Sequence, residues 1–222
     1  MRKLRKLGAF IVVPLSACAS CAGADISSSV GQDQAKIQLE TPAPNLWETG
    51  PGEGFRSSVH TLTAEVGAIQ GLGIFGSLQA HDLALLSVSY GHMLGHTVGK
   101  GHFYRGNWEL RGELFGGAQF SPSSEWLVGL TPHLRYNFAT GSRFIPFIDA
   151  GTGVTATSIR APDLSNTFEF NLQGTTGMQI FLRDNLALTV EARLVHLSCA
   201  SISNPNRGLN GVGGMVGLTY LF

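Results

Sequence analysis

The sequence has little charge, few cysteines and no long apolar run, and each shortage excludes a class of protein. Charged residues make up only 14% of the 222 residues. Lysine and arginine cluster only at positions 2–6, so no surface for binding nucleic acid is indicated. A run of about 18 apolar residues, which a membrane-spanning helix needs, is missing. The mean hydropathy of +0.13 is also too low for a bundle of such helices.

The N-terminal segment 1–24 has the pattern of a secretory signal peptide. Its basic start is followed by an apolar stretch over residues 7–15 and by small residues that end at Ala24. Cleavage near Ala24 would remove four basic residues and no acid, and would leave 11 basic against 15 acidic residues, a net charge of −4. We therefore predict a secreted protein. Residues 25–56, rich in Ser, Gln, Pro and Gly, are predicted to form a linker or N-terminal extension.

From residue 57 onward, apolar and polar residues alternate in segments separated by turn residues, and no amphipathic helix is indicated. The predicted strands cover residues 58–68, 82–94, 106–118, 126–138, 145–156, 167–181, 186–198 and 211–222. Eight antiparallel strands of about 11 residues are typical of the smallest outer-membrane β-barrels. The pattern therefore predicts an all-β domain, an eight-stranded antiparallel barrel over residues 57–222.

The alternation alone does not decide which face points inward, since a soluble lipocalin-like barrel would enclose its apolar face. Three features favour a barrel in the bacterial outer membrane. Aromatic residues lie at segment ends, where interfacial girdles form: Trp108, Trp126, Phe138, Phe168 and Phe222. The polar faces carry opposite charges that could pair in a lumen: Glu109, Arg111, Glu113, Arg135, Glu191 and Arg193. The chain ends in an alternation that resembles the assembly signal of outer-membrane proteins: Val216, Leu218, Tyr220 and Phe222.

The three cysteines are compatible with a secreted outer-membrane barrel. Residues 15–18 also resemble a lipoprotein processing box, which would leave Cys18 lipidated. We favour ordinary cleavage near Ala24, because a lipid anchor is redundant for a barrel. Cys18 and Cys21 would then be lost with the signal peptide, and Cys199 alone cannot form an intramolecular disulfide.

His196 and Ser198 end the predicted strand 186–198 and, two positions apart, share one of its faces. An imidazole beside a hydroxyl can accept its proton and make the oxygen nucleophilic. The pair continues the parity of the strand's apolar residues, so both side chains are predicted to face lipid. With both termini periplasmic, this end of the strand is extracellular. In an alternative interpretation, the two polar side chains merely lie at the headgroup boundary.

The residues that follow extend the pattern to His196-x-Ser198-Cys199-Ala200-x4-Pro205-Asn206-x-Gly208-x-Asn210. This resembles the motif His-x-Ser-Asn-Ala-x4-Pro-Asn-x-Gly-x-Glu of the lipid A 3-O-deacylase (PagL-type) outer-membrane family, without a gap. The resemblance implies a barrel that removes, without a cofactor, the ester-linked acyl chain at the 3-position of lipid A in lipopolysaccharide. It implies Ser198 as nucleophile, His196 as general base and Asn206 as the residue that stabilises the oxyanion.

Two positions depart from the family pattern. Cys199 replaces an asparagine and by parity points into the barrel, where we expect an inert thiol. Asn210 stands where the family has glutamate as third member of the triad. An amide oxygen can accept the imidazole N–H and orient the ring, but it cannot stabilise an imidazolium by charge. We therefore expect weakened or retuned hydrolysis.

Other hypotheses stay open at this point. The chain could be a non-catalytic outer-membrane barrel with a structural or adhesive role, or a soluble lipid-binding barrel of opposite sidedness, and a homodimer is also conceivable. Gly71-x-Gly73-x-x-Gly76 has the spelling of a dinucleotide fingerprint, but no helix follows, so a hairpin loop is predicted. Histidines near a turn, without carboxylates or cysteines, do not predict a metal site: His92, His96 and His102.

Overall fold

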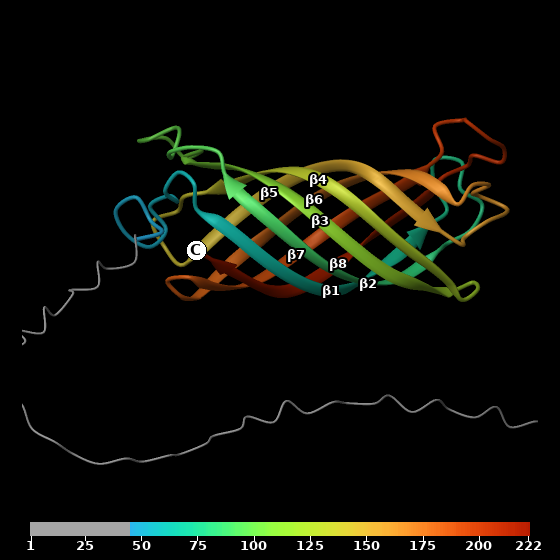
Figure 1. Cartoon of the computed structure of the whole chain (residues 1–222), viewed down its shortest axis with the longest axis horizontal. Helices are drawn as coiled ribbons and strands as arrows, with labels where there is room; N and C mark the ends of the chain where they lie inside the picture. The colour runs from blue at the N-terminus through green and yellow to red at the C-terminus, as the bar shows by residue number, and fades with distance from the viewer. Residues whose placement is uncertain (1–44) are drawn as a thin grey trace, which may run out of the picture. The chain divides into compact units, whose positions relative to one another are not determined.

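A computed structural model describes residues 45–222, and these form a closed barrel of eight antiparallel strands (Figure 1). The strands are β1 (His60–Leu72), β2 (Asp82–Met93), β3 (Gly106–Ser121), β4 (Glu125–Phe138), β5 (Phe144–Thr157), β6 (Phe168–Arg183), β7 (Leu186–Ser198) and β8 (Leu209–Leu221). Each strand pairs with the next, and β8 closes the barrel on β1. The predicted fold is confirmed. The predicted signal peptide, with Cys18 and Cys21, lies outside the described residues.

The apolar face of the sheet points outward. Buried and exposed residues alternate along the strands, and large apolar side chains are on the exposed side: Leu86 is 61% exposed and Leu194 is 59% exposed. So much exposed apolar surface is typical of a barrel surrounded by lipid. The sidedness required by a soluble lipid-binding barrel is therefore excluded. No helix among residues 45–222 is long and apolar enough to span a membrane.

Exposed aromatic side chains form a belt near each end of the barrel, as the sequence predicted. The end at which β1 begins and β8 ends has Trp108, Phe144, Tyr220 and Phe222. The opposite end has Phe120, Trp126 and Phe168. In an outer-membrane barrel with an even number of strands, the first of these ends is periplasmic and the second extracellular.

The lumen is filled with paired charges, as predicted. Arg135 has no exposed surface and lies 2.8 Å from Asp149 and 3.3 Å from Glu191. Arg193 contacts Glu191 at 2.6 Å and Glu113 at 2.8 Å. Pairing is needed here because an isolated buried charge is very costly. An eight-stranded barrel is just wide enough for side chains to fill it.

Residues that precede β1 pack against the periplasmic end of the barrel (Figure 1). The rings of Trp47 and Phe55, each only 1% exposed, stack with centroids 4.6 Å apart, and Trp47 also meets the edge of Phe181 at 4.7 Å. Glu48 accepts a hydrogen bond from the Thr97 N–H at 2.7 Å. The part of the predicted extension 25–56 that the structure describes is therefore packed onto the barrel.

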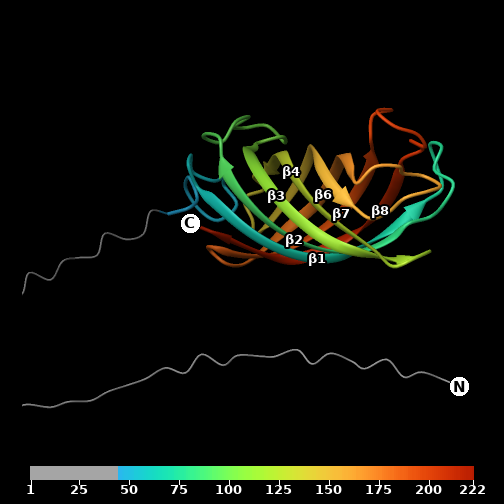
Figure 2. The ribbon, with the colours of Figure 1, turned by 45° about the vertical axis from the view of Figure 1, so that its right-hand side comes forward.

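The loops 73–81, 158–167 and 199–208 gather at the extracellular end, seen from two directions in Figures 1 and 2. The glycine-rich segment 71–76 covers the last two residues of β1 and the start of the first of these loops, which connects β1 and β2 as a hairpin. The three histidines noted in the sequence do not come together: His92 lies beside His60, His96 beside Glu48, and His102 stacks on Tyr104.

Candidate active site

His196 and Ser198 lie on the outer face of β7, as the alternation in the sequence predicted. Their neighbours Val195 and Leu197 are buried in the lumen, whereas both polar side chains are partly exposed. β7 runs toward the extracellular end, so the two residues lie at the outer-leaflet end of the barrel wall. Both residues are therefore close to the extracellular aromatic belt, since Ser198 pairs with Phe170, two residues from Phe168.

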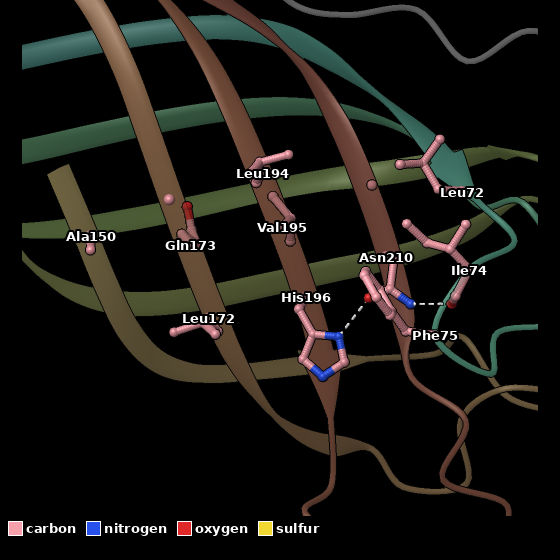
Figure 3. A pocket seen from close by; sticks show the side chains of 12 residues that line it. Leu72, Ile74, Phe75, Ala150, Leu172, Gln173, Leu194, Val195, His196 and Asn210 are labelled. Carbon is pink, nitrogen blue, oxygen red and sulfur yellow. Dashed lines mark hydrogen bonds between the residues drawn. The ribbon is translucent and has the colours of Figure 1, made fainter. Parts of the chain in front are cut away.

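Asn210 lies directly opposite His196 on the neighbouring strand. The sequence suggested that Asn210 ends a loop, but β8 already begins at Leu209, and the register pairs His196 with Asn210. The two side chains meet with Nδ1 of His196 2.8 Å from Oδ1 of Asn210 (Figure 3). Because an amide oxygen only accepts, Nδ1 carries the proton. The lone pair of the ring is therefore on Nε2.

The amide of Asn210 is itself held in one orientation. Its Nδ2 donates a hydrogen bond of 2.9 Å to the backbone carbonyl of Ile74, in the loop between β1 and β2 (Figure 3). A carbonyl can only accept, so this contact turns the amide nitrogen away from His196 and the amide oxygen toward it. Sequence reasoning did not find Ile74, which is 136 positions away and contributes only a backbone atom.

Ser198 lies two residues after His196 on the same face of β7. Among the described residues, no hydrogen bond joins the Ser198 hydroxyl to the imidazole ring. Ser198 pairs with Phe170 of β6, and His196 pairs with Leu172. Bonds between a nucleophile and its base are often long before substrate binds and shorten in the complex. The strand therefore puts both side chains on one face, and the contact between them is not formed in this structure.

Asn206 closes the loop that follows Ser198. Its Oδ1 accepts a hydrogen bond from the Cys199 N–H at 3.0 Å, and its Nδ2 makes only a long contact of 3.4 Å with Ser201 Oγ. The chain needs this support because Ala200 and Ser201 both have positive φ angles, 50° and 63°. The amide oxygen of Asn206 thus shapes the loop, and the amide nitrogen is weakly engaged.

Cys199 points into the barrel, as its parity predicted, and is 1% exposed. Its Sγ lies 3.4 Å from the Ser203 carbonyl, to which it can donate. Burial raises the pKa of the thiol, but the hydrogen bonds with Ser203 outweigh this effect and bring the pKa below its ordinary value. The thiol lies on the opposite side of the strand from the site.

Gly208 lies against the ring of His196. Its φ of +76° is in the left-handed region, which favours glycine. A Cβ at this position would lie 2.8 Å from Cε1 of His196, closer than real contacts allow. Glycine is thus required here both by the turn and by the approach of the ring.

An apolar groove of about 390 Å³ runs along the outer wall beside His196 and Asn210 (Figure 3). Leu172 and Leu194 line it on the barrel wall, and Ile74 and Phe75 of the loop 73–81 line its rim. Phe75 is 87% exposed. The site thus combines a proton acceptor, a hydroxyl and an apolar groove on the lipid-facing surface.

Together, the fold and this site define an outer-membrane β-barrel whose polar site opens sideways toward the outer leaflet. The sequence profile of the family described as lipid A 3-O-deacylase (PagL) matches residues 84–219, more than half of the chain. The chain belongs to this lipid A 3-O-deacylase family.

Solved structures share the fold. The crystal structure of the outer membrane enzyme PagL is 21% identical, covers 71% of this chain and 97% of its own, and has a TM-score of 0.51. That of Neisserial surface protein A is 14% identical, covers 73% of this chain and 97% of its own, and has a TM-score of 0.54. At such low sequence identities, these similarities support only the barrel fold. No curated protein sequence matches the chain.

Proposed function

We propose that this chain removes the ester-linked acyl chain at the 3-position of lipid A, with Ser198 as nucleophile, His196 as general base and Asn210 as the residue that orients the ring. The observation that carries the proposal is the hydrogen bond of 2.8 Å between His196 Nδ1 and Asn210 Oδ1 on the lipid-facing wall. It leaves Nε2 free to accept the proton of Ser198, as a general base must.

The reaction then follows the chemistry of acyl transfer. Ser198 Oγ attacks the ester carbonyl while Nε2 of His196 takes its proton, and a tetrahedral intermediate forms. Nε2 returns the proton to the departing 3-oxygen of the sugar as the ester bond breaks. Water, deprotonated by the same nitrogen, then hydrolyses the acyl-serine, releases the fatty acid and restores the hydroxyl.

The oxyanion of the intermediate needs a hydrogen-bond donor. Asn206 lies in the loop that follows Ser198, and its amide nitrogen carries a second N–H besides the one near Ser201, so it can donate to the oxyanion while its oxygen keeps the Cys199 contact. A preorganised amide donor of this kind is worth about 3–4 kcal/mol in the transition state. We assign this role to Asn206.

The groove supports lipid A as substrate. An acyl chain already in the outer leaflet can lie along Leu172 and Leu194, which line the groove together with His196. Its ester would then lie near the imidazole. No charged residue of the described chain lines the groove, in agreement with an alkyl ligand. The proposed substrate is therefore membrane lipopolysaccharide, and the proposed place of action is the outer leaflet of the outer membrane.

The test is release of 3-hydroxy fatty acid from purified lipopolysaccharide by the refolded barrel. We expect release by the wild-type protein and none above background by Ser198→Ala. Thr176→Ala is the matched control, since Thr176 is an exposed hydroxyl on the outer face of β6 outside the site, and it should keep wild-type release. Equal release by the wild type and Ser198→Ala would overturn the proposal and favour a non-catalytic barrel.

A further inference from the structure

A buried carboxylate in the loop between β5 and β6 holds the loop between β1 and β2. Asp163 has no exposed surface. Its Oδ1 accepts the Leu78 N–H at 2.7 Å, and its Oδ2 accepts the Gln79 N–H at 3.0 Å and lies 2.9 Å from Nε2 of His81. Three contacts from consecutive parts of one loop thus converge on a single side chain.

The loop that Asp163 holds is the one that orients the proposed triad. The Ile74 carbonyl, four positions before Leu78, accepts the Asn210 Nδ2 at 2.9 Å and the Ser77 N–H at 3.2 Å. The Asp163 backbone carbonyl also accepts the Arg207 N–H at 2.9 Å. Asp163 therefore connects the loop of Ile74 with the loop 199–208, although it touches none of the residues proposed to react.

The loop 73–81 depends on this support. Seven of its nine residues are exposed, and Gly76 has a φ of +100°, so the segment is free to move once its anchor is lost. Without the carbonyl of Ile74, the amide of Asn210 can turn its nitrogen toward His196. An amide nitrogen donates, so it would pair with an unprotonated Nδ1 and place the ring proton on Nε2. A ring in that tautomer cannot accept the proton of Ser198.

We propose that Asp163 is a positioning residue for the hydrolysis: it fixes the loop 73–81 so that the Ile74 carbonyl holds the amide of Asn210, and thereby the tautomer of His196, in the productive state. The inference rests on the proposed function of His196 and Ser198. It also makes Asn210 a working third member of the triad, because its amide accepts from the ring through the oxygen and donates to the carbonyl through the nitrogen.

Asp163→Asn is the sharpest test. The variant keeps the size of the side chain, but its amide nitrogen meets N–H groups that it cannot bind. We expect kcat to fall on the order of tenfold, the factor that corresponds to loss of one hydrogen bond, with KM little changed because the groove is untouched. Glu48→Gln is the matched control, since Glu48 also accepts a backbone N–H, at the periplasmic end. It should leave kcat unchanged.

Two further measurements separate positioning from a merely structural role. The double variant Asp163→Asn/Asn210→Ala should be no slower than Asn210→Ala alone, since without the amide there is nothing left to orient. NMR of the protein labelled with 15N-histidine should show His196 protonated on Nδ1 in the wild type and partly on Nε2 in Asp163→Asn. The His196 signals are assigned by their loss in His196→Asn.

Additive losses in the double variant, or an unchanged tautomer in Asp163→Asn, would overturn the proposal. The tautomer reports on Asp163 even if the wild type releases no fatty acid, a result that would defeat the proposed function instead. Folding is checked by heat-modifiable migration on gels. Should Asp163→Asn not fold, His81→Phe removes one of the contacts and should shift the tautomer in the same direction; a folded His81→Phe without that shift would count against the proposal.

Discussion

Asn210→Asp changes one group of the proposed triad and almost nothing else. The carboxylate keeps an acceptor 2.8 Å from the imidazole N–H of His196, adds a negative charge, and loses the donor to the Ile74 carbonyl. The two effects oppose each other, so their sizes decide the outcome.

The gain comes from the imidazolium that forms as Ser198 is deprotonated. Opposite charges about 4 Å apart attract by about 4 kcal/mol at the effective dielectric constant of about 20 that applies near a protein surface. The loss is the hydrogen bond to Ile74, about 1–3 kcal/mol. It should fall at the lower end, because the carbonyl keeps its contact with the Ser77 N–H. A net gain of about 3 kcal/mol corresponds to a rise in kcat of roughly 150-fold.

The assay is single-turnover release of 3-hydroxy fatty acid from lipopolysaccharide in mixed micelles. Asn210→Ala, which has neither acceptor nor donor, should fall below the wild type. Asn210→Glu should gain less than Asn210→Asp, because its extra methylene displaces the loop around Ile74. If Asn210→Asp is slower than the wild type, the imidazolium is not stabilised from this position, and the reasoning that places Asn210 third in the triad is wrong.

Three other predictions concern the frame around the site. Gly208→Ala should lower kcat at least tenfold with the barrel still folded, because its Cβ would displace the ring of His196; wild-type release would contradict this. Arg135→Ala should destabilise the barrel by about 3–5 kcal/mol in urea unfolding followed by tryptophan fluorescence, because it leaves Asp149 short of a partner; a loss under 1 kcal/mol would count against the lumen network. Burial raises the pKa of Asp163, but its hydrogen bonds lower it more. Its stabilisation should thus be present above about pH 4 and lost as pH falls through the lowered pKa, and Asp163→Asn should flatten that acid dependence.

The barrel fold and the outward direction of its site residues could be predicted from the sequence. Period-two alternation specifies each strand, and the parity of β7 carried His196 and Ser198 to the outer face. The limits of β7 agree with those predicted, because strong apolar alternation runs up to its end. β8 was predicted to begin two residues late, since the glycines around position 211 weaken the alternation there.

The contacts that complete the site could not be predicted from the sequence. The carbonyl of Ile74 and the carboxylate of Asp163 act through loops far apart in the chain, and a backbone atom leaves no trace in residue types. The pairing of Asn210 with His196 depends on the register between β7 and β8. The packing of Trp47 on Phe55 was missed for a related reason, because an isolated aromatic pair in an irregular segment has no period.

The outward direction of His196 and Ser198 has a kinetic consequence. An enzyme whose groove lies on the wall of a barrel meets its substrate by lateral diffusion in two dimensions, so the relevant quantity is the mole fraction of lipid A in the leaflet and not its bulk concentration. Dilution of lipopolysaccharide with inert detergent or phospholipid should slow the reaction even at constant total substrate. Both products of the proposed reaction would also form in the membrane, and a fatty acid that stays there would compete for the same groove. The composition of the leaflet would then regulate the enzyme directly.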